Sequence, residues 1–259
     1  MGKQNLSIRV LLIMEALASA GQPLSFTQLI QRTKIPKSSL CRQVHALTLA
    51  GFITRLPGQA GYVVGGRALK LSLSSLRSSS FLIEAKKSLK KLVSCINESC
   101  NLTTLSGDSV QYLVREESEL PWSLQLHVRP NVQVPLHCTA SGKLFLANLP
   151  MIEQQNYLKR LELTAYTKST ITTREGLKAE LENTFRQGFG IDNEEFVTGM
   201  VAIAVPVYGG LDKEELIAAV ACHAVSARTD LRKLLSQRAI MQKAADDVGL
   251  IFNTTESRH

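Results

Sequence analysis

The sequence contains no long hydrophobic run. Because no stretch of about 18 apolar residues occurs, we expect no membrane-spanning helix and no membrane partner. The apolar stretch nearest the N-terminus, Val10–Met14, is followed by Glu15, which favours an amphipathic helix over a signal peptide. These features predict a cytoplasmic protein.

The motifs that most enzymes need are also missing. We find no Gly-x-Ser-x-Gly elbow, Walker loop, Gly-x-Gly-x-x-Gly segment or metal-spaced histidine pair, so we expect no catalysis and no cofactor. A small-molecule hydrolase using Ser141 or Cys138 remains the rival, but on extended chain His137 and Cys138 point to opposite faces. The five cysteines, an odd number without zinc-finger spacing, indicate reduced and mostly buried thiols.

Acidic residues are scarce in the first third of the chain. Residues 1–79 contain ten Lys or Arg but only Glu15 as an acidic residue, whereas the remainder is close to electrically balanced. The net charge of +8 therefore resides in the first module. This asymmetry predicts a polyanionic partner for that module alone.

The first module has the element order of a winged helix-turn-helix domain. Ser25 and Gln28 form a capping-box pattern, and Pro36 suits the first turn of the next helix. The expected elements are helices over Ile8–Ala20, from Ser25, and over Pro36–Ala50, then extended segments Phe52–Leu56 and Tyr62–Val64. We place this domain at residues 1–66.

The third helix carries the side chains that read a DNA major groove. Leu40, Val44 and Leu47 define its core face, on which we also expect Cys41 to pack. The opposite face is predicted to present Lys37, Ser38, Ser39, Arg42, Gln43 and His45. Arginine can pair with guanine and glutamine with adenine. Candidates from the wing are Arg55, Gln59 and Arg67, although ordinary exposed polar residues would look the same.

The remainder alternates strands and helices after a linker helix over residues 67–80. Expected strands are Asn101–Ser106, Ser109–Arg115, Ser123–Arg129, Met200–Tyr208 and Leu216–Ala224. Expected helices are Phe81–Ile96, Ser141–Ala147, Pro150–Leu161, Thr173–Gln187 and Thr229–Val248. This pattern predicts an α+β domain over residues 81–259, with helices packed on a central sheet.

Several segments resemble the IclR (isocitrate lyase regulator) family of bacterial transcription regulators. Pro135–Ala147 resembles the family's PLHxTAxGKxxLA segment. Gly188–Glu195, with Gly199-Met200 and Ala204–Val207, resembles its second signature. The resemblance runs from about Leu6 to Gly249. It implies a GAF-like effector domain and a dimer or tetramer on double-stranded operator DNA.

By position, the resemblance implies an effector site made of Ala140, Ser141, Gly142, Asp192, Met200, Ala202, Ala221 and His223. The small residues at Ala140–Gly142 would open a helix whose backbone N–H groups suit a carboxylate. Asp192 could bind a ligand hydroxyl or cap a turn. His223 departs from the small hydroxyl residues common in the family, and could read an acidic ligand or only fill space.

The sequence therefore predicts a DNA-binding transcription regulator controlled by a small, acidic organic effector. A ligand-sensing adaptor without DNA binding is the alternative, although the basic face of the third helix argues against it. Neither the effector nor the direction of control, repression or activation, follows from the sequence.

Overall fold

The computed structural model describes residues 5–56, 58, 61–77, 80–118, 133–209 and 215–253. The chain forms two compact units, Met1–Ser79 and Ser80–His259. The helix that we expected as a linker over residues 67–80 belongs to the first unit, and the division falls after it. Gln59 and the expected strand Ser123–Arg129 lie outside the described residues.

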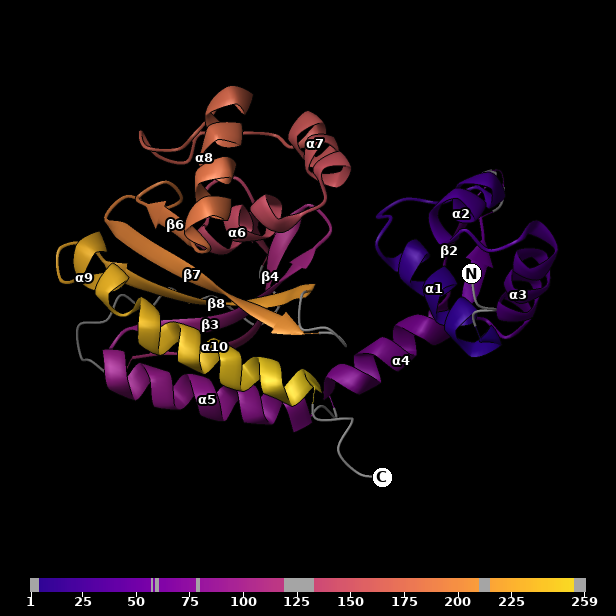
Figure 1. Cartoon of the computed structure of the whole chain (residues 1–259), viewed down its shortest axis with the longest axis horizontal. Coiled ribbons are helices and arrows are strands. Elements are labelled where there is room, and N and C mark those ends of the chain that lie inside the picture. The colour runs from indigo at the N-terminus through magenta and orange to yellow at the C-terminus, as the bar shows by residue number, and fades with distance from the viewer. Residues whose placement is uncertain are drawn as a thin grey trace. The chain divides into compact units, whose positions relative to one another are not determined.

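The first unit is a winged helix-turn-helix domain, as predicted (Figure 1). Its elements are α1 (Leu6–Ala18), α2 (Phe26–Thr33), α3 (Lys37–Leu49), β1 (Ile53–Arg55), β2 (Tyr62–Val64) and α4 (Gly66–Arg77). Strands β1 and β2 pair antiparallel, and Leu24 bridges to Tyr62, which joins the wing to the helices. Ile13, Leu29 and Leu40 are fully buried at the centre.

Local sequence signals explain how α2 begins and ends. Ser25 Oγ accepts from Gln28 N at 3.3 Å, and Gln28 Oε1 accepts from Ser25 N at 2.8 Å, which completes the predicted capping box. At the other end Lys34 adopts a left-handed backbone with φ of 53°. That turn directs the chain into Pro36 and α3, so the helix-turn-helix geometry is set locally.

The second unit is built on a six-stranded sheet with order β5-β4-β3-β8-β7-β6, in which all neighbours are antiparallel. The strands are β3 (Ser99–Ser106), β4 (Ser109–Glu116), β5 (Gln133–Pro135), β6 (Gly190–Asn193), β7 (Met200–Gly209) and β8 (Glu215–Val225). The short strands β5 and β6 were not predicted.

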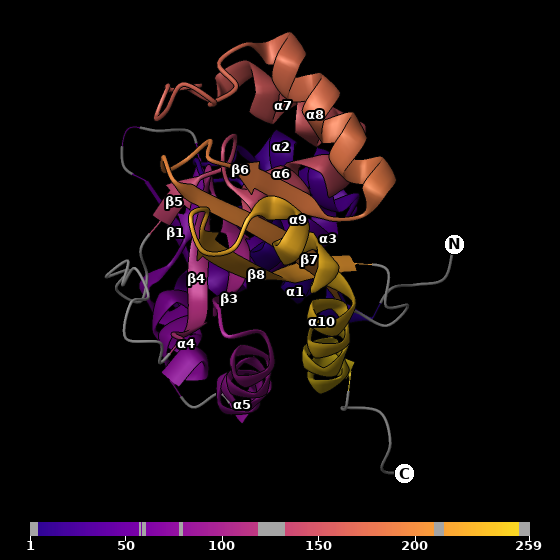
Figure 2. The ribbon, with the colours of Figure 1, turned by 90° about the vertical axis from the view of Figure 1, so that its left-hand side faces the viewer.

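Helices cover both faces of this sheet (Figure 2). The unit contains α5 (Ser80–Ile96), α6 (Ala140–Asn148), α7 (Met151–Arg160), α8 (Arg174–Gln187), α9 (Leu231–Ser236) and α10 (Arg238–Asn253). Helices α5 and α10 pack together on one face, and α6 with α8 on the other. The single helix expected over Thr229–Val248 is wrong, because α9 ends at Ser236 and Gln237 separates it from α10.

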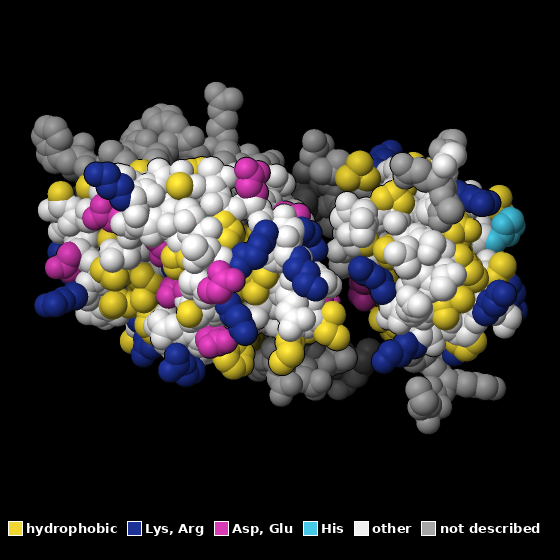
Figure 3. All heavy atoms as spheres, turned by 90° about the horizontal axis from the view of Figure 1, so that it is seen from above, with side chains coloured by type: hydrophobic (Ala, Val, Ile, Leu, Met, Phe, Trp, Pro, Cys, Tyr) yellow, Lys and Arg dark blue, Asp and Glu magenta, His cyan; other side chains and the backbone are white. Residues whose placement is uncertain are grey.

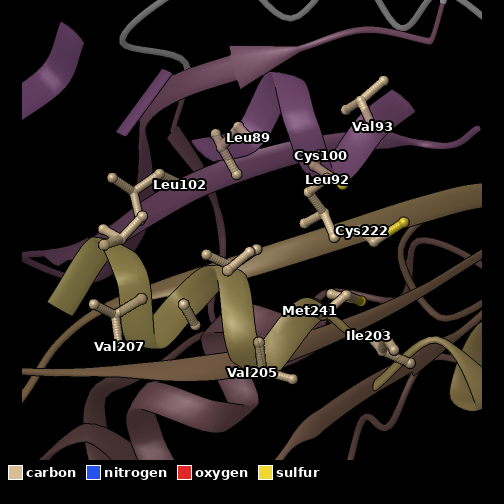
Figure 4. Packing of buried hydrophobic residues seen from close by; sticks show 14 of the residues in the cluster. Leu89, Leu92, Val93, Cys100, Leu102, Ile203, Val205, Val207, Cys222 and Met241 are labelled. Atoms are coloured by element: carbon tan, nitrogen blue, oxygen red, sulfur yellow. The ribbon is translucent and has the colours of Figure 1, made fainter. Parts of the chain in front are cut away.

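Alternation along the strands sorts the side chains between the two faces. Ile203, Val205 and Val207 join the core under α5 and α10 (Figure 4). Ala202 and Ala204 alternate with these residues and face α6, and their small size lets that helix approach the sheet. A methyl group on Gly190 would overlap the carbonyl oxygen of Ala140, so glycine is needed there. None of the described helices is long and apolar enough to span a membrane.

Candidate DNA interface and effector site

Helix α3 presents a polar face that is exposed within its own unit. The exposed residues are Lys37, Ser38, Cys41, Arg42, His45, Ala46 and Leu49. Lys37, Ser38, Arg42 and His45 therefore lie where the sequence placed them. The expected packing of Cys41 is wrong, because its thiol lies on this exposed face. Figure 3 shows Lys and Arg with a histidine on the first unit, whereas acidic and basic side chains mix over the second.

The placement of Ser39 and Gln43 on that face is wrong. Ser39 is 8% exposed and accepts a hydrogen bond from Arg9 of α1 at 3.1 Å. Gln43 is 6% exposed, and among the described residues neither of its amide atoms has a hydrogen-bond partner. Both residues directly precede core positions, Leu40 and Val44, and the buried stripe of α3 is wide enough to include them.

The wing residues have different environments. Arg55 is exposed at the end of β1. Arg67 donates to the carbonyl of Ala50 at 3.3 Å, and its guanidinium lies 4.9 Å from the centre of the Phe52 ring. These contacts join Arg67 to the C-terminal end of α3 and to Phe52 just before β1, and its side chain is exposed within the unit.

The predicted effector residues converge on the sheet face covered by α6. Asp192, Ala202 and His223 stand directly opposite one another across β6, β7 and β8. Ala221 lies in the neighbouring row, beside Ala204. All are buried within their unit, as are the first residues of α6, Ala140, Ser141 and Gly142.

The start of α6 is fixed to the sheet by hydroxyl groups. Thr139 caps the helix by accepting from Gly142 N at 3.2 Å. Thr103 of β3 donates to Ser141 Oγ at 3.0 Å and also contacts the carbonyl of Ala219 at 3.2 Å. A side chain on Gly142 would overlap the backbone of Leu136. The N-terminus of α6 therefore lies over the polar residues that β3 turns toward this face, which include Asn101 and Thr103.

Asp192 serves as a cap in this structure. Its Oδ1 accepts from the backbone N–H groups of Glu195 at 2.8 Å and Phe196 at 3.4 Å. Burial raises the pKa of its carboxyl to about 7, although the two N–H bonds oppose that shift. Asp192 can therefore hold a proton near neutral pH and donate it to an acceptor.

His223 belongs to a buried polar cluster that the sequence analysis missed. Asn101 Nδ2 lies 3.1 Å from His223 Nδ1, and Arg115 Nη1 lies 3.2 Å from His223 Nε2. Arg115 Nη1 also donates to Asn101 Oδ1 at 3.1 Å. Burial, then the charge of Arg115, lower the pKa of His223 to about 3, so its ring is neutral. Polar residues alternating with Cys100 and Leu102 along β3 were the available signal.

A second missed cluster lies behind α6. Lys143, 1% exposed, donates to Glu195 Oε1 at 2.5 Å and to Glu180 Oε1 at 2.9 Å. These bonds join α6 to α8 and to the segment after β6. Sequence patterns give little warning of such a network, because its members come from three distant segments.

Met200 completes the set of predicted residues at one edge of the site. It lines, together with His223 and Arg228, a cavity of about 10 Å³. That volume accommodates about one water molecule and is too small for an organic ligand. Within the described residues, no group of three or more His, Cys, Asp or Glu is arranged to bind a metal ion.

Comparison with known proteins assigns the chain to a family. Residues 8–57 match the IclR helix-turn-helix domain, and residues 73–250 match the C-terminal domain of the bacterial transcriptional regulator IclR. The chain belongs to the IclR family. The resemblance expected from the sequence is thereby confirmed, as is its winged-helix and effector-domain architecture.

Individual IclR-family proteins match over most of their length. The chain is 36% identical over 246 residues to the "Probable transcriptional regulator SauR" of Cupriavidus necator, covering 95% of this chain and 96% of that one. The IclR structure of Thermotoga maritima superposes with a TM-score of 0.63 at 24% identity, over 96% and 99% of the two chains.

A third relative was solved with a ligand. The inducer-binding domain of the PobR transcription factor from Acinetobacter, a double mutant in complex with 3-hydroxybenzoic acid, is 25% identical. It superposes with a TM-score of 0.56 over 63% of this chain and 94% of that domain.

Proposed function

We propose that this IclR-family regulator binds operator DNA through the exposed face of α3. The observation that carries the proposal is the side-by-side exposure of Lys37, Ser38, Arg42 and His45 on one helix. This helix lies in a module whose only acidic residue is Glu15. The guanidinium of Arg42 can form a bidentate pair with guanine. The hydroxyl of Ser38, near the N-terminus of the helix, suits contact with a phosphate. Arg55 extends this basic surface along the wing.

A gel-shift titration against the DNA upstream of its own coding sequence tests the proposal. Arg42→Ala should weaken specific binding by about 1–3 kcal/mol, or about 5- to 150-fold, and leave binding to unrelated DNA much less affected. Arg186→Ala removes an exposed arginine of α8 in the second unit and serves as the control. Equal affinities for Arg42→Ala and wild type, or no operator binding at all, would contradict the proposal and favour a ligand-sensing adaptor.

We also infer a homo-oligomer, a dimer or a tetramer. Exposed leucines on two helices of the first unit, Leu6 and Leu11 on α1 with Leu69 and Leu71 on α4, support the inference because such residues suit contact with another copy. A dimer would place its two α3 helices in successive major grooves, about one helical turn apart. Light scattering and the spacing of protected half-sites check both points.

The second unit is proposed to bind a small organic acid that alters operator affinity. The ligand of the PobR domain supports this, as does the polar row beneath α6. A catalytic role is not proposed, because burial and nearby Asp192 and Glu195 raise the pKa of Cys138 to about 12, which keeps its thiol protonated. We infer from the proposed operator binding that the protein acts in the cytoplasm. Gel shifts with and without a panel of carboxylic acids test the control.

A further inference from the structure

We propose that Arg115, Asn101 and His223 form an oxyanion subsite that holds the charged group of the effector. The inference rests on the proposed function, in which the second unit binds an organic acid, and it adds Arg115 and Asn101, which the family resemblance did not imply. Antiparallel register brings these residues together. Asn101 pairs with Arg115 of β4 on one side and with Ala221 of β8 on the other.

Hydrogen-bond donors outnumber acceptors in this cluster. The neutral ring of His223 has one N–H and one acceptor nitrogen. Both of its nitrogens face donors, namely the amide of Asn101 and the guanidinium of Arg115. Whichever nitrogen carries the proton, one N–H group therefore points at another donor.

Exchanging the two atoms of the Asn101 amide does not remove the conflict. The oxygen would then accept from His223, but the amide nitrogen would face Arg115 Nη1, which is itself a donor. The excess of hydrogen-bond donors is therefore present in either orientation of the Asn101 amide. A ligand oxygen that accepts from two of them would satisfy the cluster.

Arg115 adds an unused donor at the same place. Its Nη2 is buried and has no hydrogen-bond partner among the described residues, and its side chain is 11% exposed. Among the described residues, the one carboxylate paired with this guanidinium is Glu117, which accepts from Nε at 2.9 Å and is 42% exposed. A buried guanidinium edge without an acceptor is costly, and an oxyanion supplies what is missing.

The surroundings indicate how the rest of the ligand lies. Thr103, next on the same face of β3, pairs with Tyr112 of β4 and contacts Ser141 at the start of α6. Burial raises the pKa of Tyr112, and the charge of Arg115 opposes that shift. An oxyanion held by Arg115 would therefore have its body directed along Thr103 toward the start of α6, where the small residues Ala140–Gly142 lie.

The test uses the full chain and a matched pair of probes. Sodium acetate carries a carboxylate, and acetamide is its neutral counterpart of similar shape. Both are titrated at constant ionic strength while thermal unfolding is followed. Acetate should raise the melting temperature of the wild type and acetamide should not. Arg115→Gln should weaken the acetate effect about tenfold or more, and Arg115→Lys should restore only part of it. Arg160→Gln removes an arginine held by Asp108 elsewhere and should match the wild type.

A second measurement keeps the test decisive if Arg115→Gln fails to fold. In the wild type, the ring ¹⁵N signals of His223, assigned by their loss in His223→Gln, should move with acetate and remain still with acetamide. An equal acetate response in Arg115→Gln, or an unmoved His223 signal, would overturn the oxyanion subsite. Operator binding without any acid is measured in parallel. If the acetate results are negative but the wild type binds operator DNA, only the subsite has failed. If the wild type does not bind operator DNA, the proposed function itself has failed.

Discussion

Replacing Lys143 by methionine should strongly destabilise the second unit. The change removes the ammonium group that lies between Glu195 and Glu180, with side chains 9% and 23% exposed respectively. Within the part of the chain that the structure describes, Glu195 Oε2 already has no hydrogen-bond partner, so the carboxylate would be left buried and unpaired. Removing one partner of a buried ion pair costs about 3–5 kcal/mol, and because Glu180 can rehydrate we expect a loss of about 3 kcal/mol.

The loss should depend on pH in a defined direction. Burial already raises the pKa of Glu195 above its usual value, despite the attraction of Lys143. A carboxyl whose pKa is higher in the folded state contributes stability at low pH that is lost as pH rises through the folded value. Without Lys143 that pKa rises further. The deficit of Lys143→Met should therefore be larger at about pH 8 than at about pH 5.

Urea unfolding followed by circular dichroism at both pH values measures the effect. Lys159→Met, an exposed lysine of α7, is the control and should change little. Adding Glu195→Gln to Lys143→Met should recover part of the loss, because the amide carries no charge to bury. A deficit under about 1 kcal/mol, or equal deficits at the two pH values, would refute the reasoning.

Three further predictions concern single residues. Gln43→Met should stabilise the first unit by about 1 kcal/mol, because it removes a buried amide that has no hydrogen-bond partner among the described residues. Operator affinity should stay unchanged, and a tenfold loss of affinity would instead indicate that the amide contacts DNA. Ser25→Ala should lower the free energy of unfolding by about 1 kcal/mol through loss of the α2 cap, and an unchanged urea midpoint would contradict this. With the Asp192 pKa raised to about 7, stability should fall as pH rises from about 4 to 7, and Asp192→Asn should flatten that dependence; an unaltered slope would exclude this carboxyl as its source.

Local rules predicted most helices of the chain well. Ser25 and Gln28 predicted the start of α2, and Thr173 predicted the start of α8, because a cap needs only residues three positions apart. The exposed face of α3 was predicted less well. Leu40, Val44 and Leu47 alone predicted a buried face narrower than the one observed. Ser39 is buried in part because Arg9 of α1 contacts it, and that contact depends on where α1 packs.

The polar clusters of the second unit could not be predicted from spacing. Arg115 and Asn101 meet because β3 and β4 pair in one register, and that register shifts at a bulge after Leu102. Lys143 and Glu195 are 52 positions apart and come together only when α6 packs on the sheet. The family resemblance supplied Asp192 and His223, whereas their neighbours Asn101 and Arg115 could be found only from the tertiary structure.

Protection of the native cysteines by operator DNA tests the central claim most directly. Cys41 lies in the middle of the exposed face of α3, and Cys95 is exposed in the second unit, whereas Cys100, Cys138 and Cys222 are buried. The account predicts that bound operator slows maleimide labelling of Cys41, read by mass spectrometry, and leaves Cys95 labelling unchanged. Labelling of Cys41 at the same rate in the saturated operator complex would contradict it.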